Sequence, residues 1–417
     1  MQRTDTRSAA HQAGGDMAAS SSELIRLAET YGAHNYHPLD VVLERGDGVW
    51  VWDSEGGKYL DCLAAYSALN QGHRHPVILD ALQAQAEKIT LTSRAFHNAE
   101  MGPFLQELCA YAGMEMALPM NTGAEAVETA IKTARKWGYT KKGIPADQAQ
   151  ILACEGNFHG RTTTIVGFSS EASYREGFGP FDGGFQLIPY GSVAALRAAI
   201  TPNTAAFLVE PIQGEGGVIT PPDGYLREAR ALCREQNVLF IADEIQTGFG
   251  RTGRRFCCDH EDVVPDVITL GKALGGGVYP VSAVCASREI LGVFRPGDHG
   301  STFGGNPLAA AVARAALRVI QDERLAERAD ELGRYFVEQL RRIDAPVVKE
   351  VRGKGLMIGV EIEASAGPAR PYCEALREAG ILAKETHEQV IRFAPPLVIG
   401  REEIDWMLPR VEQVLLP

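Results

Sequence analysis

Three ionisable residues stand at the ends of apolar runs that have the length of strands. Glu210 ends the run AAFLVE, Asp243 ends VLFIAD and Lys272 ends VITLGK. An unbroken apolar run of this length predicts a strand that is buried on both faces. A charge there is costly unless a partner meets it. Burial removes the hydration of a lysine and lowers its pKa, which makes the amine a usable nucleophile for Schiff-base chemistry.

Alternating strands and helices must position these three residues. Strands are expected at residues 151–154, 205–210, 238–243 and 267–272. Amphipathic helices such as residues 224–236 lie between them, and this alternation predicts an α/β domain with a mainly parallel sheet. Ligands of such sheets bind beyond the carboxyl ends of the strands. We therefore expect one site that contains Glu210, Asp243 and Lys272.

The stretch NTGAEAVETAIKTARKWGY, which begins at Asn121, predicts a helix whose first turn could bind an anion. Thr122 and Glu125 form the S/T-x-x-E capping box, and Gly123 lets a ligand approach the backbone. Taken alone, this is also an ordinary helix start. Pyridoxal phosphate needs a lysine, a carboxylate for its pyridine nitrogen and a phosphate cradle. Asp243 would be that carboxylate, although by itself it also fits a helix N-cap.

The length of 417 residues indicates two domains, or one large domain with an appendage. Antiparallel strands in the N-terminal part are expected to turn at Gly46–Asp47 and Gly56–Gly57 and to join the C-terminal part. The expected parts are a disordered or extended segment at 1–30, the N-terminal part of a small domain at 31–66, a large cofactor-binding domain at 67–325 and a C-terminal small domain at 326–417.

Composition narrows the class of protein. The net charge of −12 argues against nucleic-acid binding, and no apolar run has the length of a membrane span. None of the eight cysteines forms a CxxC pair, so reduced thiols are expected rather than disulfides or a metal site. We expect a cytoplasmic location. A mitochondrial transit peptide is the alternative, which Arg3 and Arg7 fit and which Asp5 and Asp16 fit poorly.

Four motifs together resemble the class III (fold type I) pyridoxal-phosphate aminotransferases: ADEIQTGFGRTG, LGKALGGG, VEPIQGEGG and GSTFGGNPL. The resemblance covers nearly all of the chain after about residue 30. It is most detailed for the members that act on ornithine, through YGAHNYHPL, MNTGAEAVETA, NFHGRT and IRFAPPLVI. It implies a large α/β domain with a mainly parallel sheet and a small α+β domain built from both termini.

The resemblance also implies which residues bind pyridoxal 5'-phosphate. Lys272 would hold the cofactor through a Schiff base, and Asp243 would pair with the pyridine nitrogen. Further contacts from the same subunit would come from Thr122, Gly123, Ala124, Phe158, His159 and Gln246. Ser301 and Thr302 would reach the phosphate from the partner subunit of a homodimer. His159 stands where animal members have Trp, and we expect it to be a neutral hydrogen-bonding residue.

A second set of residues is implied to bind substrates. Tyr36 and Arg161 would hold the α-amino and α-carboxylate groups of ornithine, and Tyr66 would line the same pocket. Arg392 would bind the α-carboxylate of glutamate or 2-oxoglutarate, and Glu215 would pair with Arg392 while ornithine is bound. The substrate-binding residues implied are thus Tyr36, Tyr66, Arg161, Glu210, Glu215 and Arg392.

The implied reaction transfers the δ-amino group of L-ornithine to 2-oxoglutarate. The products are L-glutamate 5-semialdehyde, which cyclises to pyrroline-5-carboxylate, and L-glutamate. An aminotransferase for acetylornithine, 4-aminobutyrate or lysine is the first alternative, against which Tyr36 and Tyr66 argue. A pyridoxal-phosphate-binding regulator without turnover is less favoured because Lys272, Arg161 and Arg392 are all present. A dinucleotide-binding enzyme lacks support because no GxGxxG opens a helix after a strand.

Overall fold

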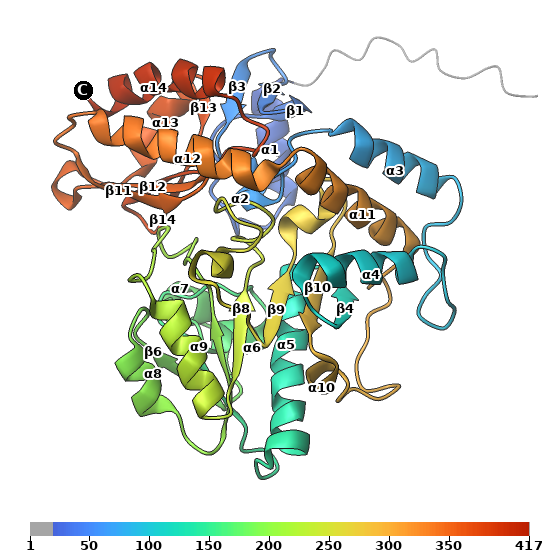
Figure 1. Ribbon diagram of the computed structural model, residues 1–417. Coiled ribbons are helices and arrows are strands. Elements are labelled where there is room, and N and C mark those ends of the chain that lie inside the picture. Colours follow the sequence, from blue (N-terminus) through green and yellow to red (C-terminus); the bar gives the residue numbers. More distant parts are fainter. Residues whose placement is uncertain (1–19, 417) are drawn as a thin grey trace, which may run out of the picture.

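The computed structural model describes residues 20–416, in which three sheets are surrounded by helices (Figure 1). The largest sheet has seven strands in the order β4-β10-β9-β8-β7-β5-β6. These are β4 (Met116–Met120), β10 (Ser282–Ala286), β9 (Val267–Leu270), β8 (Leu239–Asp243), β7 (Thr204–Val209), β5 (Gln150–Cys154) and β6 (Phe185–Ile188). Strand β10 runs antiparallel to both of its neighbours, and the other adjacent pairs are parallel. The predicted mainly parallel sheet is confirmed.

Strands β7 and β8 are buried along their whole length because helices cover both faces of the sheet. Ala206 and Leu208 pack into a cluster with α5 (Gly123–Trp137) and α6 (Thr163–Gly167). The alternate residues Phe207 and Val209 pack into a different cluster, with α8 (Val193–Ala199) and α9 (Tyr225–Glu235). This two-sided burial explains the unbroken apolar runs in the sequence.

Two smaller sheets combine the ends of the chain. One contains β1 (Leu43–Asp47), β2 (Trp50–Asp53), β3 (Lys58–Asp61) and β13 (Ile381–Leu382). The other contains β11 (Val348–Lys354), β12 (Met357–Ile362), β15 (Val390–Phe393) and β14 (Lys384–Thr386). Because β3 pairs with β13, strands near the N-terminus lie beside the C-terminal region, as Figure 1 shows in blue and red.

The turn between β1 and β2 lies later in the chain than the sequence predicted. Strand β1 continues through Asp47, and the chain turns at Gly48 and Val49 before β2. Gly48 has a φ of +57°, a left-handed conformation that suits glycine. The predicted turn at Gly46–Asp47 was therefore wrong by about two residues, because two nearby glycines offered the same signal.

The other helices surround these sheets and form the layer between them. They are α1 (Ser21–Tyr31), α2 (Ala64–Ser67), α3 (Pro76–Ala86), α4 (Met101–Ala112), α7 (Ala172–Arg175), α10 (Arg288–Leu291), α11 (Pro307–Asp322), α12 (Leu325–Arg342), α13 (Arg370–Glu378) and α14 (Arg401–Leu415). Shorter helical turns lie at Gly138–Lys142, Cys257–Glu261, Lys272–Gly275 and Ala364–Ala366. The predicted long helix after Asn306 is α11, and Asn306 caps its first turn.

Helix α1 corrects the prediction of a disordered or extended segment at residues 1–30. The Oγ atom of Ser20 accepts a hydrogen bond from the backbone N–H of Glu23, and Arg26 pairs with Glu23 one turn later. The cap satisfies a backbone N–H group at the start of the helix, and the ion pair stabilises its first turn. The part of that prediction which falls on residues 1–19 lies outside the described residues.

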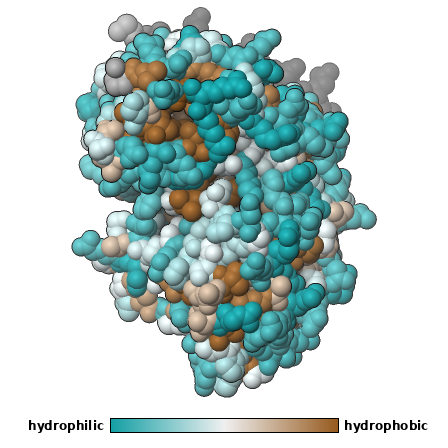
Figure 2. Space-filling model, turned by 60° about the vertical axis from the view of Figure 1, so that its left-hand side comes forward, coloured by the Kyte–Doolittle hydropathy of each residue, from teal (hydrophilic) through white to brown (hydrophobic). Residues whose placement is uncertain are grey.

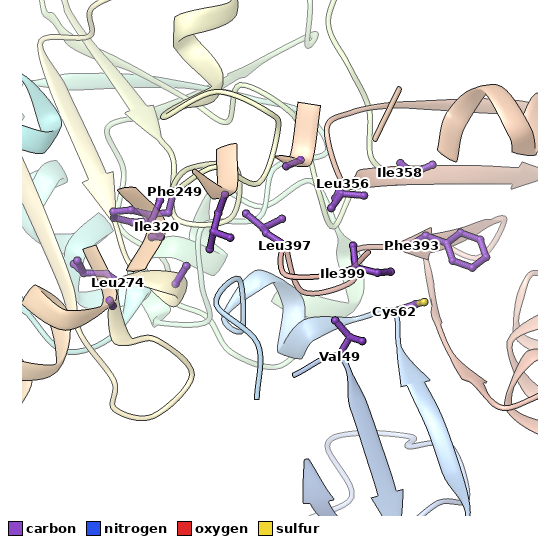
Figure 3. Packing of buried hydrophobic residues seen from close by; sticks show 14 of the residues in the cluster. Val49, Cys62, Phe249, Leu274, Ile320, Leu356, Ile358, Phe393, Leu397 and Ile399 are labelled. Carbon is purple, nitrogen blue, oxygen red and sulfur yellow. The ribbon is translucent and has the colours of Figure 1, made fainter. Parts of the chain in front are cut away.

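One hydrophobic cluster joins distant parts of the chain. Figure 3 shows Val49, from the turn between β1 and β2, and Cys62, directly after β3, near Phe393 and Ile399 of the C-terminal region. Phe249 belongs to the same cluster. In Figure 2, hydrophobic side chains gather over the upper part of one face and again at an indentation below it. The large sheet and the terminal segments therefore share a core.

Buried Arg251 ties the same parts together by hydrogen bonds. Its side chain is 0% exposed and donates to the carbonyl oxygens of Leu356 and Pro395 at 2.9 and 2.6 Å, and to Oδ1 of Asn70 at 2.6 Å. Burial lowers the pKa of Arg251 to about 9. Because Asn70 follows α2 and Pro395 follows β15, this arginine fixes both segments against the loop after β8.

Two predictions from composition concerned the state of the cysteines and the absence of a membrane span. All eight cysteines are free thiols, and all except Cys109 are buried. Within residues 20–416, no helix combines the length and the apolar character needed to cross a bilayer.

Candidate active site

The ends of three neighbouring strands meet at one cavity of about 210 Å³. Glu210 follows β7, Asp243 ends β8 and Lys272 follows β9, and all three line the cavity. The structure thus brings together the residues that the strand pattern placed at one edge. The cavity is lined by Gly123, Ala124, Phe158, His159, Gly160, Glu210, Ile212, Glu215, Asp243, Ile245, Gln246, Thr247 and Lys272.

Asp243 is buried and held by three partners. Its Oδ2 lies 2.6 Å from Nδ1 of His159, and its Oδ1 accepts from Thr269 Oγ1 at 3.0 Å and from the Ile245 backbone N–H at 3.2 Å. No helix starts at Asp243, which excludes the helix N-cap alternative. Thr269 was not predicted from the sequence. Its signal was a single hydroxyl in the apolar strand VITL, directly opposite Asp243 in the parallel pairing of β8 and β9.

His159 is a buried hydrogen-bonding residue, as expected, and the shift of its pKa runs against the expected neutral form. Burial would lower the pKa of His159, yet its hydrogen bond to Asp243 and the charge of that carboxylate outweigh burial, so the pKa is raised. The ring therefore favours its protonated form more than an ordinary histidine does. The contact between His159 and Asp243 holds the Asp243 carboxylate at the end of the cavity.

Lys272 enters the cavity through an unusual backbone conformation. Its φ is +45°, in the left-handed region, and it begins the helical turn Lys272–Gly275. Left-handed non-glycine residues cost free energy and cluster at functional sites. Burial lowers the pKa of Lys272, and the charges of Glu215 and Asp243 oppose that shift. The site thus contains an amine that loses its proton more readily than an exposed lysine.

The start of α5 supplies backbone donors on the same cavity. Thr122 is the N-cap and forms the predicted capping box with Glu125. Gly123 and Ala124, the first residues of the helix, line the cavity. A Cβ atom on Gly123 would lie 3.2 Å from Cγ2 of Ile245, so a side chain there would crowd the wall. Exposed N–H groups and the helix dipole make this end suitable for a phosphate.

Glu210 and Phe158 form the opposite wall. Oε2 of Glu210 accepts a hydrogen bond of 3.0 Å from the backbone N–H of Phe158. Burial raises the pKa of Glu210 to about 8, with His159 opposing the shift. Glu210 is therefore a largely protonated acid at neutral pH. Its contact with Phe158 orders the segment that also carries His159.

A buried ion pair joins the cavity to the small sheet. Nη1 of Arg392, in β15, lies 2.5 Å from Oε1 of Glu215, which also accepts from Nε2 of Gln246 at 3.1 Å. Burial would raise the pKa of Glu215, but Arg392 outweighs it and the pKa is lowered. Within the described residues, Nε and Nη2 of Arg392 and Oε1 of Gln246 are buried and have no hydrogen-bond partner. These atoms are free to bind polar groups of a ligand.

Tyr66 reaches Arg392 from a left-handed turn. The four residues Ala64–Ser67 all have positive φ values, from +47° to +70°. Oδ1 of Asp61 accepts hydrogen bonds from the backbone N–H groups of Leu63 and Ala64, which holds the start of this turn. The guanidinium of Arg392 lies 4.9 Å from the ring centroid of Tyr66. The turn thus places the Tyr66 ring on the arginine.

The remaining predicted residues lie around the cavity rather than on its wall. Tyr36 is 73% exposed and, with Tyr66, lines an adjacent apolar hollow of about 440 Å³. Arg161 lies over the rings of Phe158 and Tyr174, a tyrosine for which the sequence gave no signal. Asn121 donates to the Oγ of Ser301 at 2.8 Å, beside the start of α5, and Thr302 is exposed. Neither Ser301 nor Thr302 is among the residues that line the cavity in this chain.

Comparison with known proteins agrees with this arrangement. The family described as aminotransferase class-III matches residues 31–415. The chain belongs to this family. An ornithine aminotransferase of Bacillus subtilis (strain 168) is 61% identical over 397 residues, which is 95% of this chain and 98% of that protein.

Two solved structures of this family are similar to the whole chain. One is an ornithine aminotransferase from Toxoplasma gondii, which has partial occupancy of PLP at its active site. It is 48% identical, has a TM-score of 0.94 and covers 96% of this chain and 95% of that one. The other is an acetylornithine aminotransferase from Elizabethkingia anophelis, which is 49% identical and has a TM-score of 0.86. The match covers 95% of this chain and 99% of that one. These neighbours confirm the fold type that the motifs implied.

Proposed function

We propose that this protein transfers the δ-amino group of L-ornithine to 2-oxoglutarate. The products are L-glutamate 5-semialdehyde, which cyclises to pyrroline-5-carboxylate, and L-glutamate. The observation that carries this proposal is the Glu215–Arg392 pair beside Lys272, because a removable carboxylate on a buried arginine suits two alternating substrates. The 61% identity to an ornithine aminotransferase supports the same choice.

We infer that the cofactor is pyridoxal 5'-phosphate, which the cavity residues fit. Lys272 would hold it covalently, Asp243 would meet its pyridine nitrogen, and Gly123 and Ala124 would face its phosphate. Phe158 would lie against the ring of the cofactor. The side chain of Gln246, whose Oε1 has no hydrogen-bond partner among the described residues, would lie near the phenolic oxygen of the cofactor. When bound, the cofactor supplies a ring that accepts the electrons of a substrate C–H bond.

The protein's own contribution is proton transfer and charge placement. The ε-amine of Lys272 would take the proton from the substrate carbon as general base and deliver it to C4′ of the cofactor as general acid, and its lowered pKa increases the fraction of free amine. The Asp243 carboxylate would keep the ring nitrogen of the cofactor protonated. His159 and Thr269 hold that carboxylate in place, so it does not have to be ordered during the reaction.

Substrate choice follows from the groups around Arg392. Ornithine presents its δ-amine and has no carboxylate near that end, so Glu215 stays on Arg392. Glutamate presents its α-amine with a carboxylate beside it, which takes the place of Glu215. Tyr36 and Arg161 would hold the far end of ornithine, and Tyr66 would line the space between the two ends.

We further propose that the active unit is a homodimer. Thr302 is exposed, and it would complete the phosphate site of the partner subunit together with Ser301. The exposed hollow beside Tyr36 is largely apolar in its residues, which suits burial against a second copy of the chain. The cytoplasmic location expected from the sequence remains a prediction.

An amino-donor comparison tests the function. The purified holoenzyme is given 2-oxoglutarate with L-ornithine, N-acetylornithine, 4-aminobutyrate or L-lysine, and glutamate and semialdehyde formation are measured. We expect the highest kcat/KM with L-ornithine. A higher value with N-acetylornithine would replace the proposed substrate, and a cofactor-bound protein without turnover on any donor would favour a regulatory role.

A further inference from the structure

Arg161 is held by aromatic rings. Its guanidinium carbon lies 3.7 Å from the ring centroid of Tyr174 and 5.4 Å from that of Phe158. The two rings meet edge to face, with centroids 6.1 Å apart and planes at 79°. Among residues 20–416, Arg161 has no hydrogen bond or ion pair. A guanidinium on a ring face gains cation–π attraction while its five N–H donors stay free.

Tyr174 is well suited to support a cation. It lies on α7, is half-buried, and contacts Phe158, which lines the cofactor cavity. Burial raises the pKa of Tyr174 and the Arg161 cation opposes the shift, so the phenol stays neutral. The charges of Glu215, Glu171 and Tyr36 add to the increase.

We propose that Tyr174 is a positioning residue for the α-carboxylate of ornithine, acting through Arg161. The ring holds the arginine and leaves its donors for the carboxylate. This inference rests on the proposed function and deepens it. Tyr174 itself does not bind the substrate in this account.

Preorganisation is the physical reason for such a contact. Arg161 is an exposed, long side chain, and ordering it at the moment of binding would cost conformational entropy. The ring stack orders the guanidinium beforehand. Glutamate would place its α-carboxylate on Arg392, so the ring stack of Arg161 should matter for ornithine and little for the α-carboxylate of glutamate.

The test uses Tyr174→Leu, which removes the ring, and Tyr174→Phe, which keeps the ring face. Single-turnover reactions of the holoenzyme are followed by cofactor absorbance with L-ornithine, with 1,4-diaminobutane and with L-glutamate. The diamine is ornithine without its carboxylate. For Tyr174→Leu we expect the half-saturating concentration of ornithine to rise about two- to fivefold. The value for diaminobutane stays unchanged, and Tyr174→Phe behaves like the wild type.

A second variant and a double mutant separate positioning from folding. Tyr174→Met, close in size but without a ring, repeats the test if Tyr174→Leu does not fold. In an Arg161→Gln background, loss of the ring should have no further effect on ornithine. An unchanged value for ornithine in both ring-less variants, or an equal loss with all three amines, overturns the inference while leaving the proposed function intact. A wild-type enzyme that does not convert ornithine overturns both.

Discussion

Replacing Glu215 by alanine should change the balance between the two half-reactions. In this structure Arg392 is 1% exposed and has one carboxylate partner, Oε1 of Glu215 at 2.5 Å. Without Glu215, Arg392 has no anionic partner while ornithine is bound. Glutamate brings its own carboxylate to the same arginine. The variant should therefore be slower with ornithine and equal or faster with glutamate.

The size of the effect follows from the burial of Arg392. Leaving a buried charge without its partner costs about 3–5 kcal/mol. At about 1.36 kcal/mol per factor of ten, this penalty corresponds at most to a change of roughly 10²- to 5 × 10³-fold in the ratio of the two rates. The Tyr66 ring, 4.9 Å from the guanidinium, and water that enters the space of the lost side chain reduce this penalty. We expect a change of at least about tenfold.

The assay is single-turnover conversion of the cofactor, measured separately with L-ornithine and L-glutamate. Glu107→Ala is the matched control, because it removes an ion pair of 2.8 Å with Arg314 between α4 and α11, away from the cavity. The control should leave the ratio of the two rates unchanged. If Glu215→Ala also leaves that ratio unchanged, the Glu215–Arg392 pair is structural and the reasoning fails.

Three further predictions follow from the same geometry. Lys272→Ala should fold and lose turnover, because the proton-transferring amine is gone; repeated turnover with ornithine would remove Lys272 from this role. Burial raises the pKa of Glu210 from 4.5 to about 8, so folding takes up a proton between those values and stability falls as pH rises. Urea unfolding of the cofactor-free wild type and Glu210→Gln should show the wild type losing stability relative to the variant between about pH 5 and 8, and parallel profiles would contradict this pKa. Subunit exchange between Lys272→Ala and an impaired Thr302→Ala should restore activity by creating one intact site, and no recovery after proven exchange would place Thr302 in its own subunit's site.

The sequence by itself was sufficient for the residues that follow a local rule. Apolar runs with a charged last residue gave β7, β8 and β9 together with Glu210, Asp243 and Lys272, because parallel strands bring their carboxyl ends to one edge. The capping box at Thr122 gave the start of α5, since a cap depends only on residues three apart. The pairing of Glu215 with Arg392 came from family resemblance, not from any local pattern.

Local rules failed where contacts from elsewhere outweighed them. AAYS contains no glycine or asparagine, yet Ala64–Ser67 adopt left-handed conformations that cost roughly 1 kcal/mol or more per residue. Asp61 and the surrounding core hold that turn and bring Tyr66 to Arg392. The pKa of His159 likewise has no local signal, because it is raised by Asp243, 84 positions away in the chain.

The tertiary structure decided the contacts between distant segments. Glu215, in the loop after β7, and Arg392, in β15, are 177 positions apart. Thr386 of β14, the strand beside β15, donates a hydrogen bond of 2.8 Å to the carbonyl oxygen of Glu215 and holds that loop against the small sheet. The stack of Arg161 on Tyr174 depends on how the segment after β5 folds back, which no residue spacing encodes. Sequence periodicity determines which residues stand at the ends of strands. Long-range packing determines which residues form an ion pair, a cation–π contact or a hydrogen bond with one another.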